Sequence, residues 1–429
     1  MKALHKNILE RLDQIINDTG KHIHDFIDDP HAFTRKRTLD TATVLKTTIN
    51  MQGQDLTSEL FRTFGKSATH MKSKVVSTST YVQRKGQLSP ACFKHILTIF
   101  NQNLFSTQLF DHQYRLFAID GSDFNQIWNP KSKNIVQSSP HKKTPYCQIH
   151  VNALYDLLNN TYQDCIFQPK AEMDERKAAI QLLKTLNCGP FSILFEPRQA
   201  MGDLKTLPDQ ECDRDISCRV TTSHQYYVTH KVSENIHYVQ HHYHQYLKYR
   251  SKNTIDRSWD FEKFCTVKFR ACKLRINDPD SNKEEWEVVL TNLDRENYPL
   301  KRIKELYYLH WGIETSFKKI KYSLGSVQFH SKQDKFIEME IYAHMIMFNA
   351  ISQIDAQVYI PQRHCKYQYA VNFKQSCSII QSMYLTSSSR DYERILIQIS
   401  YYTVPIRPGR KDERNIKSKS AVYYLYRVA

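Results

Sequence analysis

The stretch Tyr307-Tyr-Leu-His-Trp-Gly-Ile-Glu-Thr-Ser-Phe-Lys-Lys-Ile-Lys321 decides how this chain is interpreted. Polar side chains within it stand at offsets of −7, −4, 0, +4 and +7 from a single glutamate: Tyr307, His310, Glu314, Lys318 and Lys321. Because side chains three or four residues apart share one face of a helix, these offsets place them on one stripe. The stretch therefore predicts a helix whose lone carboxylate lies between two lysines on one side and an imidazole and a phenol on the other.

The same helix has an apolar stripe whose members recur every three or four residues: Leu306, Leu309, Ile313, Phe317, Ile320 and Leu324. This periodicity is typical of a helix face that packs against a core. Two cations one and two turns beyond a glutamate suit an anionic polymer whose phosphates lie beside a metal-binding carboxylate. A solvated helix with an ordinary Glu–Lys pair would show the same residues, so the rest of the chain must decide between these interpretations.

Length and charge narrow the class of protein. A chain of 429 residues exceeds one compact core, so two or three domains are expected. Lys plus Arg number 60 and Asp plus Glu number 44, which gives a net charge of +16. A surplus of this size favours a polyanionic partner, and nucleic acid is favoured over a membrane because the sequence has no long apolar run.

The amino-terminal residues and the cysteines indicate a cytoplasmic protein. Residues 1–20 lack the apolar segment of a secretory signal and have the spacing of an amphipathic helix. The ten cysteines include no CxxC pair, as expected of reduced thiols rather than of a disulfide framework or a zinc site.

Three regions follow one another along the chain. Residues 1–112 are predicted to be mostly helical and carry basic clusters, so they form either a DNA-binding module or a solvated cap. Residues 113–350 begin with an α/β pattern, and residues 200–300 within them are predicted to form a β-rich insertion. Four histidines in that insertion, at 237, 241, 242 and 244, indicate a polar strand surface more than a metal site. Residues 351–429 are predicted to form a helical and basic carboxyl-terminal region.

Acidic residues follow two predicted strands of the α/β pattern. Its elements are strands at 116–119, 148–154, 162–168 and 191–195, and a helix at 174–186. Asp120 follows the first strand and Glu196 follows the last, and strand ends are where an open sheet places ligands. With Glu314 they supply three carboxylates, which can hold two divalent ions about 4 Å apart. Oxygen ligands and a phosphate substrate favour Mg²⁺ or Mn²⁺ over zinc.

Short motifs in a fixed order carry a family resemblance. They are Ala118-Ile-Asp-Gly-Ser122, Ala153-Leu-Tyr-Asp-Leu-Leu-Asn159, Leu290-Thr-Asn-Leu-Asp294, Tyr307 through Gly325, Phe329-His-Ser-Lys332 and Glu340-Ile-Tyr-Ala343. With them, from about residue 60 to the end, the chain resembles the DDE transposases of bacterial insertion sequences, in the insertion-sequence-four family marked by the YREK signature.

The resemblance implies an RNase H-like catalytic core that cuts and pastes insertion-sequence ends. It implies Mg²⁺ or Mn²⁺ on Asp120, Glu196 and Glu314, strand hydrolysis, and then attack of a 3′-hydroxyl on target DNA. Tyr307 and Lys321 match the signature Tyr and Lys, and Lys318 is an additional phosphate contact. The implied partners are double-stranded DNA, as terminal repeats and as target, and a second copy of the chain in a homodimer. The implied location is the nucleoid of a bacterial cytoplasm.

Two positions depart from the family pattern. Glu196 stands where the family has its second Asp, and its extra methylene can displace a group that must be placed to about 0.5 Å. Asp203 is an alternative ligand nearby. His310, which is expected to contact DNA together with Tyr307, Lys318 and Lys321, replaces the signature Arg and cannot form a bidentate fork to phosphate. Together they give the alternative of a weakened or inactive transposase-derived DNA-binding protein.

Overall fold

The computed structural model describes residues 7–34, 39–65, 76–102, 108–112, 115–137, 145–185, 191–194, 212–221, 226–229, 264–276, 285–291, 293–361, 366–385 and 391–407. The chain divides into two compact units. The first contains residues 1–193 and 312–429, and the second contains residues 194–311.

The first unit begins with a group of helices. They are α1 (Ile8–Lys21), η1 (Ile23–Phe26), α2 (Thr41–Ile49), α3 (Leu56–Phe64), α4 (Thr78–Gly86) and α5 (Pro90–Gln102). Side chains that cap helix amino termini precede four of them: Asn7, Asp40, Asp55 and Ser77 each accept a hydrogen bond from a backbone N–H in the first turn. The described part of residues 7–102 is therefore mostly helical.

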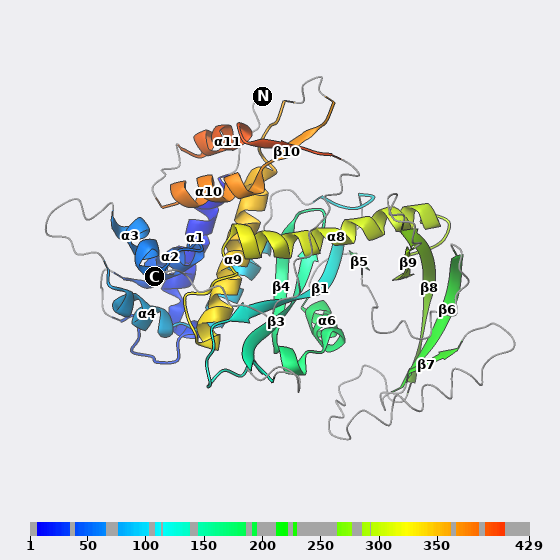
Figure 1. Ribbon diagram of the computed structural model, residues 1–429, viewed down its shortest axis with the longest axis horizontal. Coiled ribbons are helices and arrows are strands. Elements are labelled where there is room, and N and C mark those ends of the chain that lie inside the picture. The colour runs from blue at the N-terminus through cyan, green and yellow to red at the C-terminus, as the bar shows by residue number, and fades with distance from the viewer. Residues whose placement is uncertain are drawn as a thin grey trace. The chain divides into compact units, whose positions relative to one another are not determined.

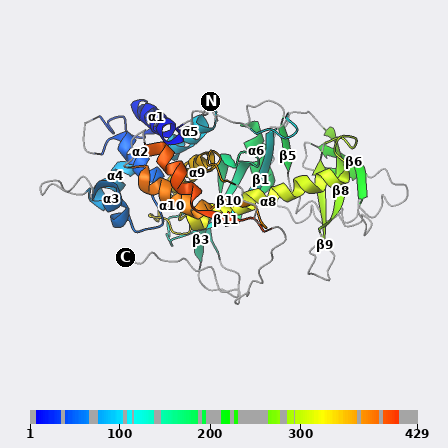
Figure 2. The same cartoon turned by 90° about the horizontal axis from the view of Figure 1, so that it is seen from above.

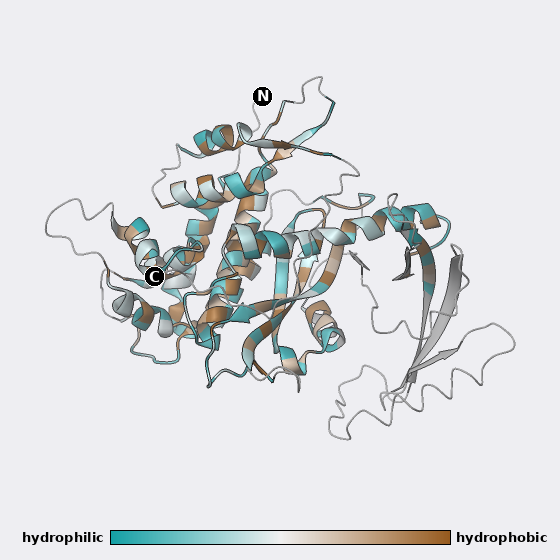
Figure 3. Ribbon diagram, in the orientation of Figure 1, coloured by the Kyte–Doolittle hydropathy of each residue, from teal (hydrophilic) through white to brown (hydrophobic). Residues whose placement is uncertain are grey.

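Helices α1, α2 and α5 pack against α9 (Asp334–Asp355), which also contacts β4. Helix α9 lies beside α1 and α2 in Figure 1, and much of it carries the hydrophobic colouring in Figure 3. Residues on every side of α9 are buried, including the polar Glu340, His344 and Asn349. Because α9 packs against both the amino-terminal helices and the sheet, these helices belong to the same compact unit as the sheet. A separate domain for residues 1–112 stays a prediction.

A mixed α/β layer follows. Its strands are β1 (Arg115–Gln126), β2 (Ile135–Val136), β3 (Tyr146–Asp156), β4 (Thr161–Pro169) and β5 (Phe191–Leu194). The strand order is β2-β3-β1-β5, and β4 also pairs with β3. Strand β3 is antiparallel to β1, β2 and β4. After η3 (Lys170–Glu172), α6 (Glu175–Lys184) packs against β1, β3 and β4. The strands and the helix predicted from the sequence are present.

The position of Asp120 differs from the sequence prediction. We expected β1 to end just before Asp120, but the strand continues to Gln126 and pairs Asp120 with Ala153. Residues 120–123 resemble a turn in composition, yet their backbone forms ladder hydrogen bonds with β3, and tertiary pairing overrides the local preference. Asp120 is therefore in the middle of a strand.

Helix α8 (Leu300–Ser323) confirms the helix predicted around Glu314. Most of its predicted apolar stripe is buried, but Leu309 is 42 % exposed. In the first unit the ring of Phe317 lies 6.3 Å from that of Phe124 on β1, and α8 passes along the sheet in both views (Figure 1 and Figure 2).

The second unit contains the predicted β-rich segment. Its strands are β6 (Cys212–Thr221), β7 (Tyr226–Thr229), β8 (Phe264–Ile276) and β9 (Glu285–Thr291), in the antiparallel order β7-β6-β8-β9. Arg270 of β8 donates to the backbone oxygens of Leu293, Asp294 and Tyr298 at 2.9–3.0 Å. These bonds fix the segment that leads into α8. The four histidines at 237, 241, 242 and 244 lie outside the described residues.

The carboxyl-terminal part of the first unit returns to α9. It comprises β10 (Tyr369–Val371), α10 (Phe373–Met383), α11 (Tyr392–Ser400) and β11 (Thr403–Pro405), and β10 pairs antiparallel with β11. Helices α10 and α11 both contact α9. Across the described residues, no helix combines the length and the apolar character that crossing a membrane requires.

Candidate active site

Asp120 lies on the face of β1 that α8 covers. Side chains at positions 120, 122 and 124 share one face of the strand because successive residues alternate. On that face Lys321 Nζ donates to Ser122 Oγ at 2.7 Å and lies 4.7 Å from the centre of the Phe124 ring. Asp120 itself is partly buried, and its Oδ1 accepts the backbone N–H of Gly121 at 2.8 Å.

Two contacts fix the direction of α8 along β1. A Cβ on Gly312 would lie 3.2 Å from Leu157 Cδ2, and the N–H of Leu157 donates to the oxygen of Leu116 near the start of β1. Nine residues later on the helix, Lys321 reaches Ser122. Helix α8 therefore runs in the same direction as β1, from the level of Leu116 to the level of Ser122.

Glu314 and Lys318 lie between these contacts on α8. Glu314 is partly buried and Lys318 is exposed. Lys321 is directed toward β1, and burial lowers the pKa of its ammonium group. The structure thus gives Lys321 a defined role between α8 and β1, whereas its predicted contact with phosphate stays a prediction.

None of the other predicted site residues lies in the described part of the first unit. Tyr307 and His310 belong to the second unit, and only 7 % and 5 % of their surfaces are exposed. Glu196 and Asp203 lie outside the described residues. Within the described ranges no group of three His, Cys, Asp or Glu side chains is arranged to hold a metal ion.

Sequence reasoning missed the hydroxyl contacts that join α8 to the sheet. Tyr162 of β4 and Ser316 of α8 form a buried hydrogen bond of 2.6 Å between their oxygens. Ser122 accepts from Lys321. Ser122 and Ser316 both lie inside the family motifs, each two residues after a proposed acid, Asp120 or Glu314. This shared spacing could have indicated that the two serines support the site.

A second group of charged side chains lies on the opposite face of β1. His150 Nδ1 is 2.6 Å from Asp123 Oδ1, and its Nε2 is 3.4 Å from Glu175 Oε1 at the start of α6. Lys170 Nζ lies 2.7 Å from Asp123 Oδ2. A Cβ on Gly121 would come within 2.3 Å of His150 Nε2, so the imidazole packs directly on this glycine. The cluster supports the backbone immediately after Asp120.

The basic residues of α4 do not form a free DNA-binding surface. Lys85 is buried and lies 2.9 Å from Glu340 of α9. Arg84 donates to the backbone oxygen of Leu39 and to the side chain of Gln87. The other basic residues of these amino-terminal clusters, at 35–37, 66, 72 and 74, lie outside the described residues.

Comparisons with known proteins identify one family. Residues 111–350 match the family described as "Transposase DDE domain". The search of curated proteins found no match. Among solved structures, the chain is similar to one titled "Cryo-EM structure of piggyBac transposase synaptic complex with hairpin DNA (SNHP)". The identity is 12 %, the alignment covers 94 % of this chain and 84 % of that chain, and the TM-score of 0.35 is too low to indicate a shared arrangement.

The family match includes the strand that carries Asp120 and the whole of the helix that carries Glu314. It covers more than half of the 429 residues. The chain therefore belongs to the transposase DDE domain family.

Proposed function

We propose that this protein is a DNA transposase that cleaves insertion-sequence ends and joins them to target DNA, using Asp120, Glu196 and Glu314 as metal ligands. The observation that carries the proposal is the contact of Lys321 with Ser122. It lays the helix of Glu314 along the face of β1 that bears Asp120, inside a chain that belongs to the transposase DDE domain family.

The direction of α8 supports a short distance between the two acids. Glu314 lies between Gly312 and Lys321, and Asp120 lies between Leu116 and Ser122. Going back from the Lys321–Ser122 contact, Glu314 is seven helical residues away, about 10 Å, and Asp120 is two strand residues away, about 7 Å. Glu314 and Asp120 then lie at similar positions along α8 and β1, on the surfaces of the helix and the strand that face each other.

The side chains proposed as ligands fit a hard divalent cation. Carboxylate oxygens are what Mg²⁺ and Mn²⁺ prefer, and Asp120 and Glu314 are both partly buried on a sheet and a helix, which are rigid supports. When bound, such ions would activate a water or a 3′-hydroxyl and stabilise the leaving oxygen. Glu196, two residues beyond the end of β5, is the third proposed ligand, with Asp203 as the alternative.

The surrounding residues would bind and orient DNA. Lys318 is exposed on α8 and would contact a phosphate directly. Lys321 would hold α8 against β1 and present its positive charge near the scissile phosphate. Tyr307 and His310 are the other proposed DNA contacts. A homodimer on double-stranded DNA, an RNase H-like topology and a separate DNA-binding role for residues 1–112 belong to the same proposal.

The first test is divalent-dependent nicking of a supercoiled plasmid. We expect Mg²⁺ or Mn²⁺ to be required, and Glu314→Gln to lower the rate by about 100-fold or more because a metal ligand is lost. Glu305→Gln is the matched control, since Glu305 is an exposed acid on the same helix that pairs with Arg302. Nicking that survives Glu314→Gln at the rate of the control would exclude Glu314 from the reaction.

A second candidate is a DNA-binding protein that has lost cleavage, and the identity of residues 196 and 310 favours it. It predicts duplex binding without nicking, and a gain of nicking in the double variant Glu196→Asp, His310→Arg. Inertness of that double variant while it binds Mn²⁺ would show that these two positions do not explain the loss.

A further inference from the structure

Tyr162 occupies a buried position between the sheet and α8. Its ring lies 5.9 Å from that of Phe317 on α8 and 5.1 Å from that of Phe348 on α9. Its hydroxyl is 2.6 Å from Ser316 Oγ, and both residues have at most 1 % of their surface exposed. A buried phenol of this kind needs a hydrogen-bond partner, and Ser316 supplies it.

The direction of this hydrogen bond follows from the second contact of the serine. Ser316 Oγ donates to the backbone oxygen of Ile313 at 2.6 Å, which uses the only proton of its hydroxyl. Tyr162 is therefore the donor and Ser316 the acceptor. The two hydrogen bonds, from the phenol to Ser316 and from Ser316 to Ile313, span the turn of α8 that contains Glu314. The phenol therefore fixes the rotation of that turn about the helix axis.

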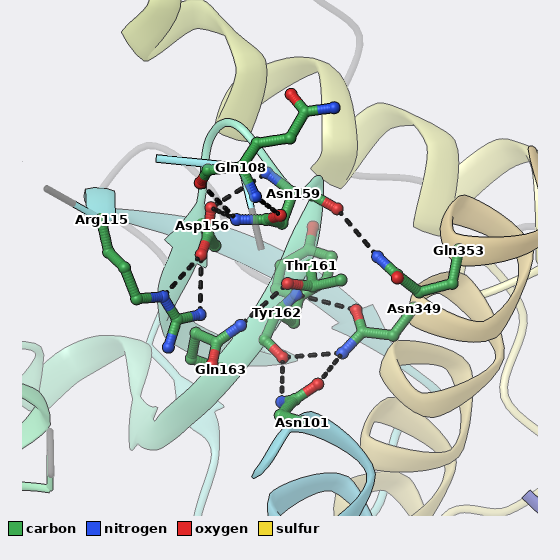
Figure 4. Close-up of polar contacts among 10 residues, drawn as sticks. All are labelled: Asn101, Gln108, Arg115, Asp156, Asn159, Thr161, Tyr162, Gln163, Asn349 and Gln353. Carbon is green, nitrogen blue, oxygen red and sulfur yellow. Dashed lines mark hydrogen bonds and ion pairs between the residues drawn. The ribbon is translucent and has the colours of Figure 1, made fainter. Parts of the chain in front are cut away.

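The backbone of Tyr162 is held from the other side by α9. Asn349 accepts from the N–H of Tyr162 through Oδ1 at 2.8 Å and donates to its oxygen through Nδ2 at 2.8 Å (Figure 4). Asn101 of α5 donates to the same oxygen at 2.8 Å and accepts from Asn349 Nδ2 at 2.9 Å. Because Asn349 is fully buried, these bonds leave the residue little freedom to shift.

The turn that precedes Tyr162 is fixed in the same way. Asp156 Oδ1 accepts from the N–H and from Nδ2 of Asn159 at 3.0 and 2.9 Å, and Asp156 Oδ2 pairs with Arg115 at 2.7 Å. Gln353 of α9 donates to the oxygen of Asn159 at 3.3 Å. Figure 4 shows that these side chains come from the sheet, α5 and α9 and converge on the turn between β3 and β4. This network supports the backbone on either side of the phenol.

The phenol also lies within electrostatic reach of Asp120. Burial raises the pKa of Tyr162 well above its usual range, and the negative charge of Asp120 is among the groups that add to this rise. Tyr162 therefore interacts electrostatically with Asp120 and forms a hydrogen bond with Ser316, in the helical turn that contains Glu314.

We propose that Tyr162 is a positioning residue that sets the distance between Glu314 and Asp120 through its hydrogen bond to Ser316. This role rests on the proposed function of the two acids as ligands of one metal site. Removing the hydroxyl leaves the phenyl ring to fill the same space, so the packing of α8 is kept and the rotation of the Glu314 turn is released. A shift of about 1 Å in a catalytic group can lower a rate about 100-fold.

The test compares Tyr162→Phe and Ser316→Ala with Tyr81→Phe. Tyr81 is a matched control because its buried hydroxyl is 2.6 Å from Thr48 Oγ1, which in turn bonds a helix carbonyl at 2.7 Å, far from the acids in sequence. We would measure the thermal unfolding midpoint, duplex affinity, Mn²⁺ affinity by electron paramagnetic resonance of free Mn²⁺ with a DNA duplex present, and the single-turnover nicking rate.

We expect the three variants to lose similar stability and to bind duplex like the unchanged protein. Tyr162→Phe and Ser316→Ala should weaken Mn²⁺ binding about 3- to 10-fold and lower the nicking rate about 10- to 100-fold at saturating DNA. The double variant should be no worse than the poorer single variant, because each single variant already breaks the hydrogen bond between Tyr162 and Ser316. Tyr81→Phe should leave Mn²⁺ affinity and rate unchanged.

Two outcomes would overturn the positioning role and are distinguishable from failure of the proposed function. Mn²⁺ affinity and nicking in Tyr162→Phe equal to those of Tyr81→Phe would reject the positioning role alone. Mn²⁺ binding that Glu314→Gln does not weaken would reject the metal site and the positioning role together. Loss of Mn²⁺ affinity in Tyr162→Phe without any nicking by the unchanged protein would support positioning and reject the catalytic function.

Discussion

Gly121 shows how one small residue serves the two faces of β1. Asp120, the residue before it, points to one face of the strand. On the opposite face Gly121 leaves room for the imidazole of His150, whose Nε2 would lie 2.3 Å from any Cβ at position 121. The imidazole in turn is held by Asp123 and Glu175. A glycine after the first acid is therefore a packing requirement here, because any larger side chain must displace His150 and the start of α6.

The same cluster predicts how stability depends on pH. Burial alone would lower the pKa of His150, but the hydrogen bond to Asp123 and the nearby carboxylate of Glu175 outweigh it and raise the pKa to about 9. A folded-state pKa above the unfolded value of about 6.5 means that the stabilisation is complete below pH 6.5 and is lost as the pH rises through 9. The loss should be about 2 kcal/mol, since the partly exposed Glu175 is screened by solvent.

Denaturant unfolding between pH 6 and pH 9.5 tests this expectation. The unchanged protein should lose stability across the window, and His150→Gln should start lower and follow a flatter curve. Asp123 contributes to the pH dependence at low pH. Burial would raise the pKa of Asp123, but His150 and Lys170 lower it, so its contribution to stability is lost as the pH falls. Parallel curves for the two proteins above pH 6.5 would contradict the assignment to His150.

Helices α4 and α9 are joined by a buried ion pair that the sequence did not indicate. Lys85 Nζ lies 2.9 Å from Glu340 Oε1, and Glu340 Oε2 accepts from the N–H of His330 at 3.0 Å. Burial by itself would raise the pKa of Glu340, but Lys85 and His330 hold it well below its usual range. The pair fixes how an amino-terminal helix packs on the central helix.

Removing the acid of this pair should be costly. Glu340→Gln leaves the Lys85 ammonium buried without a counter-charge, so we expect a loss of about 3–5 kcal/mol in the free energy of unfolding. Glu338→Gln is the control two residues away, because Glu338 pairs with the exposed Lys133 and should cost less than about 1 kcal/mol. Equal losses in the two variants, measured by urea unfolding, would argue against a special contribution of the buried pair.

The contrast between α8 and α9 shows which elements the sequence could predict. Helical periodicity identified α8 and most of its apolar stripe, and short apolar runs identified the strands. It could not give the extension of β1 past Asp120, because the ladder with β3 is formed by a distant segment. Nor could it give the burial of Lys85, whose partner is 255 residues away. Tyr162 was missed as a support of the site because its hydroxyl meets Ser316 only in the folded chain.

At the scale of the whole molecule, the net charge of +16 governs the expected response to salt. If the protein binds duplex DNA through six to ten phosphates, its affinity should fall about 10³- to 10⁵-fold between 50 and 200 mM salt. Fluorescence anisotropy with a labelled duplex measures this directly.

Lys318 and Lys21 separate a DNA contact from general charge in that measurement. Lys318→Gln should reduce the slope of log affinity against log salt by about 1, because an exposed lysine of α8 is proposed to contact a phosphate. Lys21→Gln removes an exposed lysine that pairs with Asp18 on α1 and should leave the slope unchanged. Identical slopes for both variants would remove Lys318 from the interface.

The all-round burial of α9 has a consequence for how this chain can diverge. Its residues meet α1, α2, α5, α10 and α11 as well as β4, so a substitution on any side must be matched by a neighbour from a different part of the sequence. An amino-terminal region borrowed from a distant relative would meet a surface shaped for other side chains. We therefore expect the amino-terminal helices and the sheet to evolve together, with correlated substitutions at the positions that pack against α9.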